Sequence, residues 1–154
     1  MTNELFFSPA YQALPKSSMN LFHCLMNELR FTKKRGKRIF TNNGEVSLAE
    51  VQFKEMFSCA SQTYLNARDK LIEVGLIKLT YRGGMGSGDM TKYKILALTD
   101  LPKDEQRWLK YPDSNWKSDI PTAKGLTIGK DTRWKKGQSG RKVISHPNEV
   151  DPKV

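Results

Sequence analysis

The residues with the clearest chemical potential in this sequence are clusters of cations. The run KKRGKR at 33–38 places five cations within six residues, and RWKKGQSGRK at 133–142 joins further cations to small residues. The whole chain of 154 residues carries 26 Lys and Arg against 16 Asp and Glu, a formal net charge of +10. This excess favours a polyanionic partner, nucleic acid ahead of an anionic membrane. The run at 33–38 is therefore either a solvated loop or an arm that contacts phosphates through Lys33, Lys34 and Arg35.

The side chains that usually carry catalysis are scattered along the chain. They are the histidines His23 and His146, the cysteines Cys24 and Cys59, and the linker acids Asp100, Asp104 and Glu105. Hydrolysis or phosphoryl transfer needs clustered carboxylates, a metal set or a nucleophile with its base. We therefore expect no catalytic residues, no metal site and no cofactor, and we expect that the protein is not an enzyme.

A glycine-rich segment, GGMGSG at 83–88, raises the possibility of a phosphate-binding loop. Nucleotide-binding loops end in Gly-Lys-Ser/Thr and continue into a helix whose N-terminus holds the phosphate. No such ending follows here, and the next segment has the composition of a strand. We interpret 83–88 as the flexible tip of a β-hairpin.

Three segments before this tip are predicted to be helices. The first is 18–31, with a cap at Ser17 or Ser18, and the second is 47–57, opened by the capping-box pattern Ser47-x-x-Glu50. The third is 59–74, with Ser58 and Ser61 as candidate N-caps and Gly75 as a left-handed C-terminal residue. Its apolar stripe consists of Ala60, Tyr64, Ala67, Leu71 and Val74.

The second and third helices have the length and spacing of a helix-turn-helix unit. A short helix packed across a longer one leaves the N-terminal half of the longer helix exposed, where it can enter a DNA major groove about 12 Å wide. After Gly75, apolar and polar residues alternate over 77–82, and 90–98 supplies a returning strand, so 76–98 is predicted to be a hairpin.

This order of elements resembles the winged helix-turn-helix DNA-binding proteins of bacteria, phages and plasmids, over residues 17–99. The most specific segment is TYLNARDKLIEVGLI at 63–77, which is similar to the family pattern Thr-apolar-x-x-Ala-x-x-x-Leu-x-x-x-Gly-Leu/Phe-Ile. Arg68 stands where many transcriptional regulators have an apolar residue after the Ala. This departure is more similar to phage and plasmid replication or regulatory proteins, whose opening is also similar to SPAYQALP at 8–15.

The resemblance implies an α+β fold, a winged helix-turn-helix of three helices and a β-hairpin wing. Around this domain at 17–99 we expect an irregular lead-in at 1–16 and an extended or disordered basic tail at 100–154. The helix 59–74 would be the recognition helix and 76–98 the wing. The implied DNA-binding residues of helix, turn and wing are Ser58, Ser61, Gln62, Thr63, Asn66, Lys70, Arg82, Lys92 and Lys94. Gln62 and Asn66 carry the amide edge that pairs bidentately with adenine.

The expected function is sequence-specific binding of double-stranded DNA by a phage or plasmid transcriptional regulator. A replication initiator or accessory protein with the same domain, and a winged helix used as a protein-interaction module, are the alternatives. A homodimer through the broad apolar face of the first helix is possible, as is a protein partner or a nucleic acid at the basic, aromatic-containing segment 100–154. The N-terminus lacks a charged region followed by a long apolar run, so we expect a cytoplasmic, nucleoid-associated protein without membrane attachment.

Overall fold

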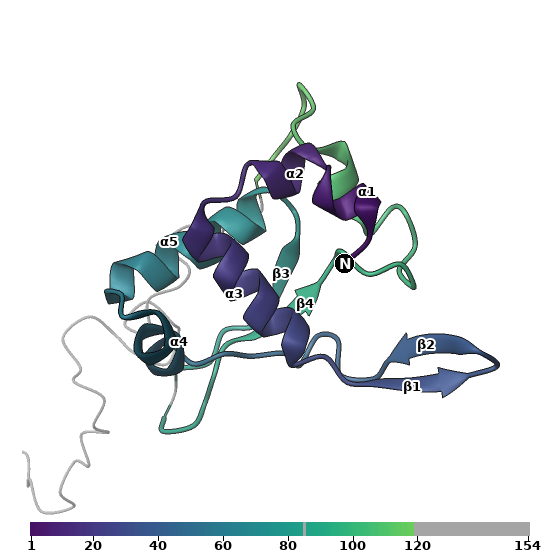
Figure 1. The fold of residues 1–154 in the computed structure, drawn as a ribbon. Helices are drawn as coiled ribbons and strands as arrows, with labels where there is room; N and C mark the ends of the chain where they lie inside the picture. Colours follow the sequence, from purple (N-terminus) through teal and green to yellow (C-terminus); the bar gives the residue numbers. More distant parts are fainter. Residues whose placement is uncertain (85, 119–154) are drawn as a thin grey trace, which may run out of the picture. The chain divides into compact units, whose positions relative to one another are not determined.

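The computed structural model describes residues 1–84 and 86–118, which have an α+β architecture with two separate antiparallel hairpins (Figure 1). The helices are α1 Asn3–Phe6, α2 Pro9–Gln12, α3 Lys16–Asn27, α4 Glu50–Phe57 and α5 Ser61–Glu73, followed by a 3₁₀ helix, η1 Arg107–Lys110. The strands are β1 Phe31–Lys34, β2 Lys37–Phe40, β3 Ile77–Tyr81 and β4 Lys92–Ile95. Among these described residues, none of the helices combines the length and the apolar composition needed to cross a lipid bilayer.

The core forms where α3 packs against α5. Leu21, Phe22 and Leu25 of α3 and Ala67 and Leu71 of α5 are each at most 1% exposed. These residues recur at spacings of three and four, which places them on one face of each helix. The apolar face of α3 that we considered for a two-fold interface thus also packs against α5 within the chain.

Both helices of the predicted helix-turn-helix are present, but their N-termini differ from the prediction. The Ser47/Glu50 capping box is wrong, because α4 begins at Glu50 after Ala49 and the backbone N–H of Ala49 donates to Gln52 Oε1 at 3.2 Å. The chain just before it is extended because Val46 O accepts from the Tyr93 N–H at 2.8 Å. Neither serine caps α5, whose N-cap is Ala60, and Ser58 is the left-handed residue that ends α4 (φ 48°).

The C-terminus of α5 agrees with the prediction from Gly75. Gly75 has a φ of +80°, its N–H donates to Ile72 O at 3.1 Å, and the Leu76 N–H donates to Leu71 O at 3.0 Å. These two bonds make a Schellman motif, which satisfies carbonyls at the end of the helix and turns the chain into β3.

The predicted hairpin after Gly75 is also present. β3 and β4 are antiparallel, with Ile77 opposite Ile95 and Leu79 opposite Tyr93, and the register shifts between Leu79 and Tyr81. Ile77, Tyr93 and Ile95 are buried, which is what the apolar alternation in this segment predicts. The hairpin β3–β4 therefore has one face in the core.

Residues 1–16 differ from the irregular lead-in that we expected. They contain α1 and α2, and Ser8 joins them, because its Oγ donates to Leu5 O at 2.7 Å and accepts from the Tyr11 N–H at 3.2 Å. Leu5 and Tyr11 are buried in the core. Pro9 does not interrupt helical structure here because it occupies the first turn of α2, where no N–H is needed.

Residues 100–118 differ from the extended tail that we expected. Trp108 is 3% exposed and its Nε1 donates to Leu96 O at 3.2 Å, and Trp116 Nε1 donates to Glu73 O at 2.8 Å. The side chains of these two tryptophans pack this segment onto the domain. The sequence did not predict this packing because the segment contains few aliphatic residues. The predictions for the rest of the tail, including 133–142, lie outside the described residues.

The basic run at 33–38 is part of a hairpin, which we name the arm (residues 31–40). β1 and β2 pair with Lys34 opposite Lys37, and Arg35 and Gly36, both with positive φ, make the turn. Positive φ at both central residues is typical of the type I′ turn that closes two-residue hairpins. Of the cations that we predicted to lie in a solvated loop or a phosphate-contacting arm, four thus lie on two strands that project from the helices, and Arg35 lies in the turn between them (Figure 1).

Candidate nucleic-acid interface

The exposed face of α5 carries two neighbouring amides. Gln62 and Asn66 are exposed, one helical turn apart, and Gln62 Nε2 donates to Asn66 Oδ1 at 2.8 Å. Tyr64, Ala67 and Leu71 on the other side of the helix are buried. The buried apolar side thus holds the helix in the core. The hydrogen bond between Gln62 and Asn66 fixes the two amides relative to each other on the exposed side.

The other predicted contacts near this face are partly engaged within the chain. Ser61 Oγ accepts from Lys54 Nζ at 3.0 Å, and Lys70 Nζ lies 3.1 Å from Glu73 Oε2. Ser58 is exposed in the turn between α4 and α5, and Thr63 is half-buried. The structure therefore gathers Ser58, Ser61, Gln62 and Asn66 around the N-terminal half of α5, with Lys70 further along the helix.

The three predicted contacts on the β3–β4 hairpin have different surroundings. Arg82 is exposed at the end of β3. Lys92 forms an ion pair with Glu45, whose hydrogen bond and negative charge raise the pKa of Lys92. Lys94 Nζ lies 2.5 Å from Glu105 Oε2, so this cation is tied to the segment that packs on the base of the hairpin. Arg82 and Lys92 remain candidates for phosphate contact, whereas Lys94 has a structural partner that the sequence did not indicate.

A buried polar group joins α5 to β4. Tyr64 OH donates to Leu48 O at 3.0 Å and lies 3.4 Å from Tyr93 OH. Arg68 lies beside the same pair and donates from Nε and Nη2 to Asp69 Oδ1 at 2.9 and 2.8 Å. Through the Tyr64–Tyr93 contact this group links α5 to β4 of the hairpin. The sequence marked Arg68 as unusual but did not indicate its neighbours.

The tyrosine pair predicts a loss of stability at alkaline pH. Burial raises the pKa of both Tyr64 and Tyr93 above the ordinary value, although the charge of Arg68 acts in the opposite direction. As the pH passes about 10, the unfolded chain releases these protons before the folded chain does, so the free energy of unfolding falls by up to about 1.4 kcal/mol per pH unit for each tyrosine. Below that pH both states hold the protons and this contribution to the pH dependence vanishes.

Urea unfolding between pH 8 and 11.5 measures this effect. Tyr93→Phe is expected to make the decline in stability shallower, whereas Tyr81→Phe, at an exposed position, is the control for loss of a hydroxyl. Equal declines for Tyr93→Phe and the parent protein would contradict the burial of the phenol.

The predicted arm residues do not join the α5 surface. Lys33, Lys34 and Arg35 are exposed on the arm. Asn43, three residues after the arm, bonds the chain to β4: its Nδ2 donates to Ile95 O at 3.0 Å, and the Ile95 N–H donates to its Oδ1 at 2.7 Å. Ile95 pairs with Ile77, just after the C-terminus of α5. Gln62 lies at the opposite end of that helix, so the predicted DNA-binding residues form two separate groups.

Comparison of the chain with protein-family models, curated proteins and solved structures finds no match.

Proposed function

We propose that the chain is a winged helix-turn-helix protein that binds double-stranded DNA at specific sequences, as a phage or plasmid transcriptional regulator. α4 and α5 would be the helix-turn-helix, with α5 in the major groove, and β3–β4 would be the wing. The observation that carries the proposal is the pair of exposed amides on α5. Its supporting features are the net charge of +10 and the resemblance of residues 63–77 to the recognition helices of this class.

The amide pair has the donor and acceptor pattern that adenine requires. Because Gln62 uses an Nε2 hydrogen toward Asn66, its Oε1 is available as an acceptor beside the Nδ2 donor of Asn66. Adenine presents its N6 amino donor and N7 acceptor side by side in the major groove. A pair of amides already oriented in the free protein loses less side-chain entropy on binding. We therefore expect A·T base pairs at the centre of the recognised sequence.

The wing would supply phosphate contacts that position α5 without contributing sequence information. Arg82 is exposed, and Lys92 would exchange Glu45 for a phosphate oxygen or bind phosphate as part of the exposed pair. The Tyr64–Tyr93 contact links the wing to the helix, which supports the proposal that both contact one duplex.

Selection from a randomised double-stranded DNA pool at two salt concentrations tests the proposal. We expect an enriched motif containing A·T pairs, with affinity that falls as salt rises by a log–log slope of about 0.9 for each phosphate contacted. Binding without any enriched motif would contradict the sequence-specific reading by α5. No binding at low salt would contradict DNA binding itself and favour the protein-interaction alternative.

A further inference from the structure

The arm is a concentrated positive charge without internal compensation. Its ten residues contain the cations Lys33, Lys34, Arg35, Lys37 and Arg38 and no carboxylate. Every arm residue except Phe40 is exposed. Within residues 1–84 and 86–118, none of the ion pairs involves an arm cation. Such a surface attracts a polyanionic partner.

The strand register of the arm places like charges opposite each other, which lowers the stability of the hairpin. Lys33 lies opposite Arg38 and Lys34 opposite Lys37, and like charges directly opposite each other destabilise a hairpin. A hairpin of two strands is marginally stable even without this repulsion. Its stabilising contacts lie near the base. The rings of Phe31 and Phe40 pack edge to face with their centroids 6.2 Å apart, and Arg38 Cζ lies 4.8 Å from the centroid of the Phe31 ring. A bound polyanion would remove the repulsion between the strands.

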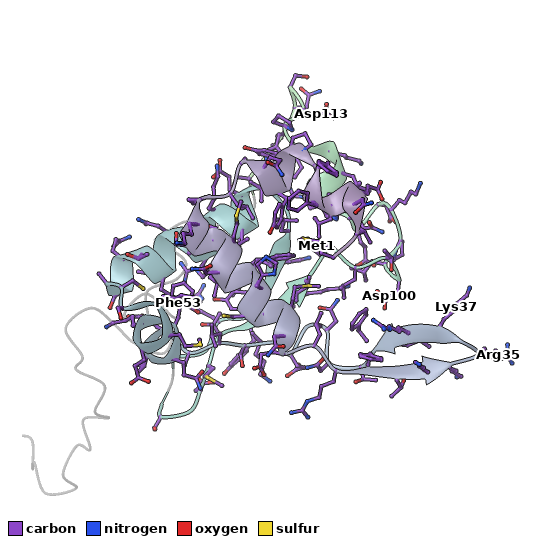
Figure 2. The ribbon with its side chains drawn as sticks, in the orientation of Figure 1. Met1, Arg35, Lys37, Phe53, Asp100 and Asp113 are labelled. Atoms are coloured by element: carbon purple, nitrogen blue, oxygen red, sulfur yellow. The ribbon has the colours of Figure 1, made fainter. Side chains whose placement is uncertain are left out.

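The turn of the arm is also less stable than it could be, because a cation occupies a position that prefers another residue type. Arg35 has a φ of 50° and Gly36 a φ of 76°, which is the type I′ geometry that prefers Asn-Gly. A non-glycine residue other than Asn or Asp is strained in this conformation, and such strain tends to occur at functional sites. Arg35 thus places a fifth cation at the tip, where asparagine would make a more stable turn (Figure 2).

The arm also borders a groove suited to a sugar–phosphate backbone. This groove has a volume of about 1030 Å³ and lies between the arm and the body of the domain. Its lining includes the cations Lys34, Lys37 and Arg38, the apolar residues Met26 and Leu98, and Asp100. Positive walls around a partly apolar floor accommodate phosphates and the sugars between them.

The location of the arm separates it from α5. The chain just after the arm is bonded through Asn43 to Ile95, near the C-terminus of α5. Gln62 lies at the other end of this helix of 13 residues, which is about 20 Å long. In Figure 1 the arm projects from the side of the domain opposite to the N-terminus of α5. A duplex centred on Gln62 and Asn66 therefore leaves the arm free for a different segment.

We propose that the arm is a second DNA-binding element that holds a duplex segment other than the one bound by α5, so that one molecule joins two segments. A two-stranded β-ribbon fits the major groove, and the five cations supply phosphate contacts along its edges. This inference rests on the proposed function for the choice of DNA as the polyanion. An acidic protein is the other class of partner that the same charge would attract.

The test uses variants that remove charge from the arm while relieving its strain. Lys34→Gln with Lys37→Gln removes a repulsive pair, and Arg35→Asn installs the preferred turn residue, so the triple variant is expected to melt no lower than the parent protein. The matched control replaces three exposed cations elsewhere with glutamine: Lys16, Lys103 and Lys110. Both triple variants lower the net charge equally.

Two assays separate the two DNA-binding elements. Beads carrying a short duplex with the selected motif are loaded with a limiting amount of full-length protein, and capture of a second, fluorescent duplex is measured. The arm variant is expected to lose about 90% of this capture and to reduce its log–log salt slope by about 3, one for each lost phosphate contact. Its affinity for the short motif duplex, measured by fluorescence anisotropy, is expected to match that of the control.

Three results would overturn the inference. The parent protein binds the motif but captures no second duplex; the arm variant captures it as well as the control; or capture and motif affinity fall together, which would place the arm on the same surface as α5. In each case the parent protein still binds the motif, which distinguishes this failure from failure of the proposed function. If the parent protein binds no duplex at all, both fail, and binding of the arm to an acidic protein becomes the competing explanation.

Discussion

Gly75→Ala is expected to lower the free energy of unfolding by about 3 kcal/mol. Alanine at a φ of +80° costs about 1–2 kcal/mol in backbone strain. Its Cβ would also lie 2.9 Å from Trp116 Cη2 and 3.0 Å from the backbone nitrogen of Trp108, and overpacking of this kind costs about 1–3 kcal/mol. Because a domain is stable by only about 5–15 kcal/mol, the loss is a large fraction of the total.

Gly88→Ala is the matched control for this prediction. Gly88 has a nearly identical φ of +81°, but an added Cβ there meets no atom within 4 Å. Urea unfolding of both variants separates backbone strain, which they share, from the clash with residues 107–116, which only Gly75→Ala has. Equal losses in the two variants would contradict the packing of the two tryptophan-bearing turns on the end of α5.

The parts of the fold that the sequence predicted are those with local signals. The α5 stripe, the C-terminal position of Gly75 and the alternation after it each depend on residues within one or two turns of each other. The start of α4 was predicted wrongly because Val46 pairs with Tyr93, a contact between residues 47 positions apart. Residues 100–118 were assigned to a tail because the burial of Trp108 and Trp116 depends on Leu96 and Glu73, which no local pattern reveals.

The candidate site shows the same division. The exposure of Gln62 and Asn66 follows from helical periodicity, since they lie off the apolar stripe. The partners of Lys92 and Lys94, Glu45 and Glu105, lie 47 and 11 residues away and change which wing cations are available. The charge of the arm indicated a solvated loop or a phosphate-contacting segment, but its hairpin was not predicted, because Arg35 is not a residue that indicates a type I′ turn. Tertiary contacts, rather than composition, thus determine which of these cations have a carboxylate partner.

Gln62→Ala combined with Asn66→Ala is expected to abolish most base discrimination by α5. A bidentate amide–adenine contact is worth about 1–3 kcal/mol of discrimination, so the ratio of affinities for the selected motif and for a version with its central A·T pairs changed should fall by about 10- to 100-fold. Both side chains are exposed and alanine is the best helix former, so the double variant should remain folded. Affinity for non-specific DNA and its salt slope should be unchanged, because neither residue is charged.

Two comparisons make this result specific to base contact. Asn27→Ala removes an exposed amide from the end of α3 and should leave the discrimination ratio intact. Arg82→Ala, at the wing, should weaken binding to both DNA sequences equally and reduce the log–log salt slope by about 1. If the double variant still selects the original motif, α5 does not contact the bases through its amides, and sequence specificity must come from the wing, the arm or the shape of the DNA. In the proposed scheme Arg82 and the arm cations contact phosphates, so their loss weakens binding without changing the selected motif. Retention of the motif by the double variant is therefore the result that would show that Gln62 and Asn66 do not read the bases.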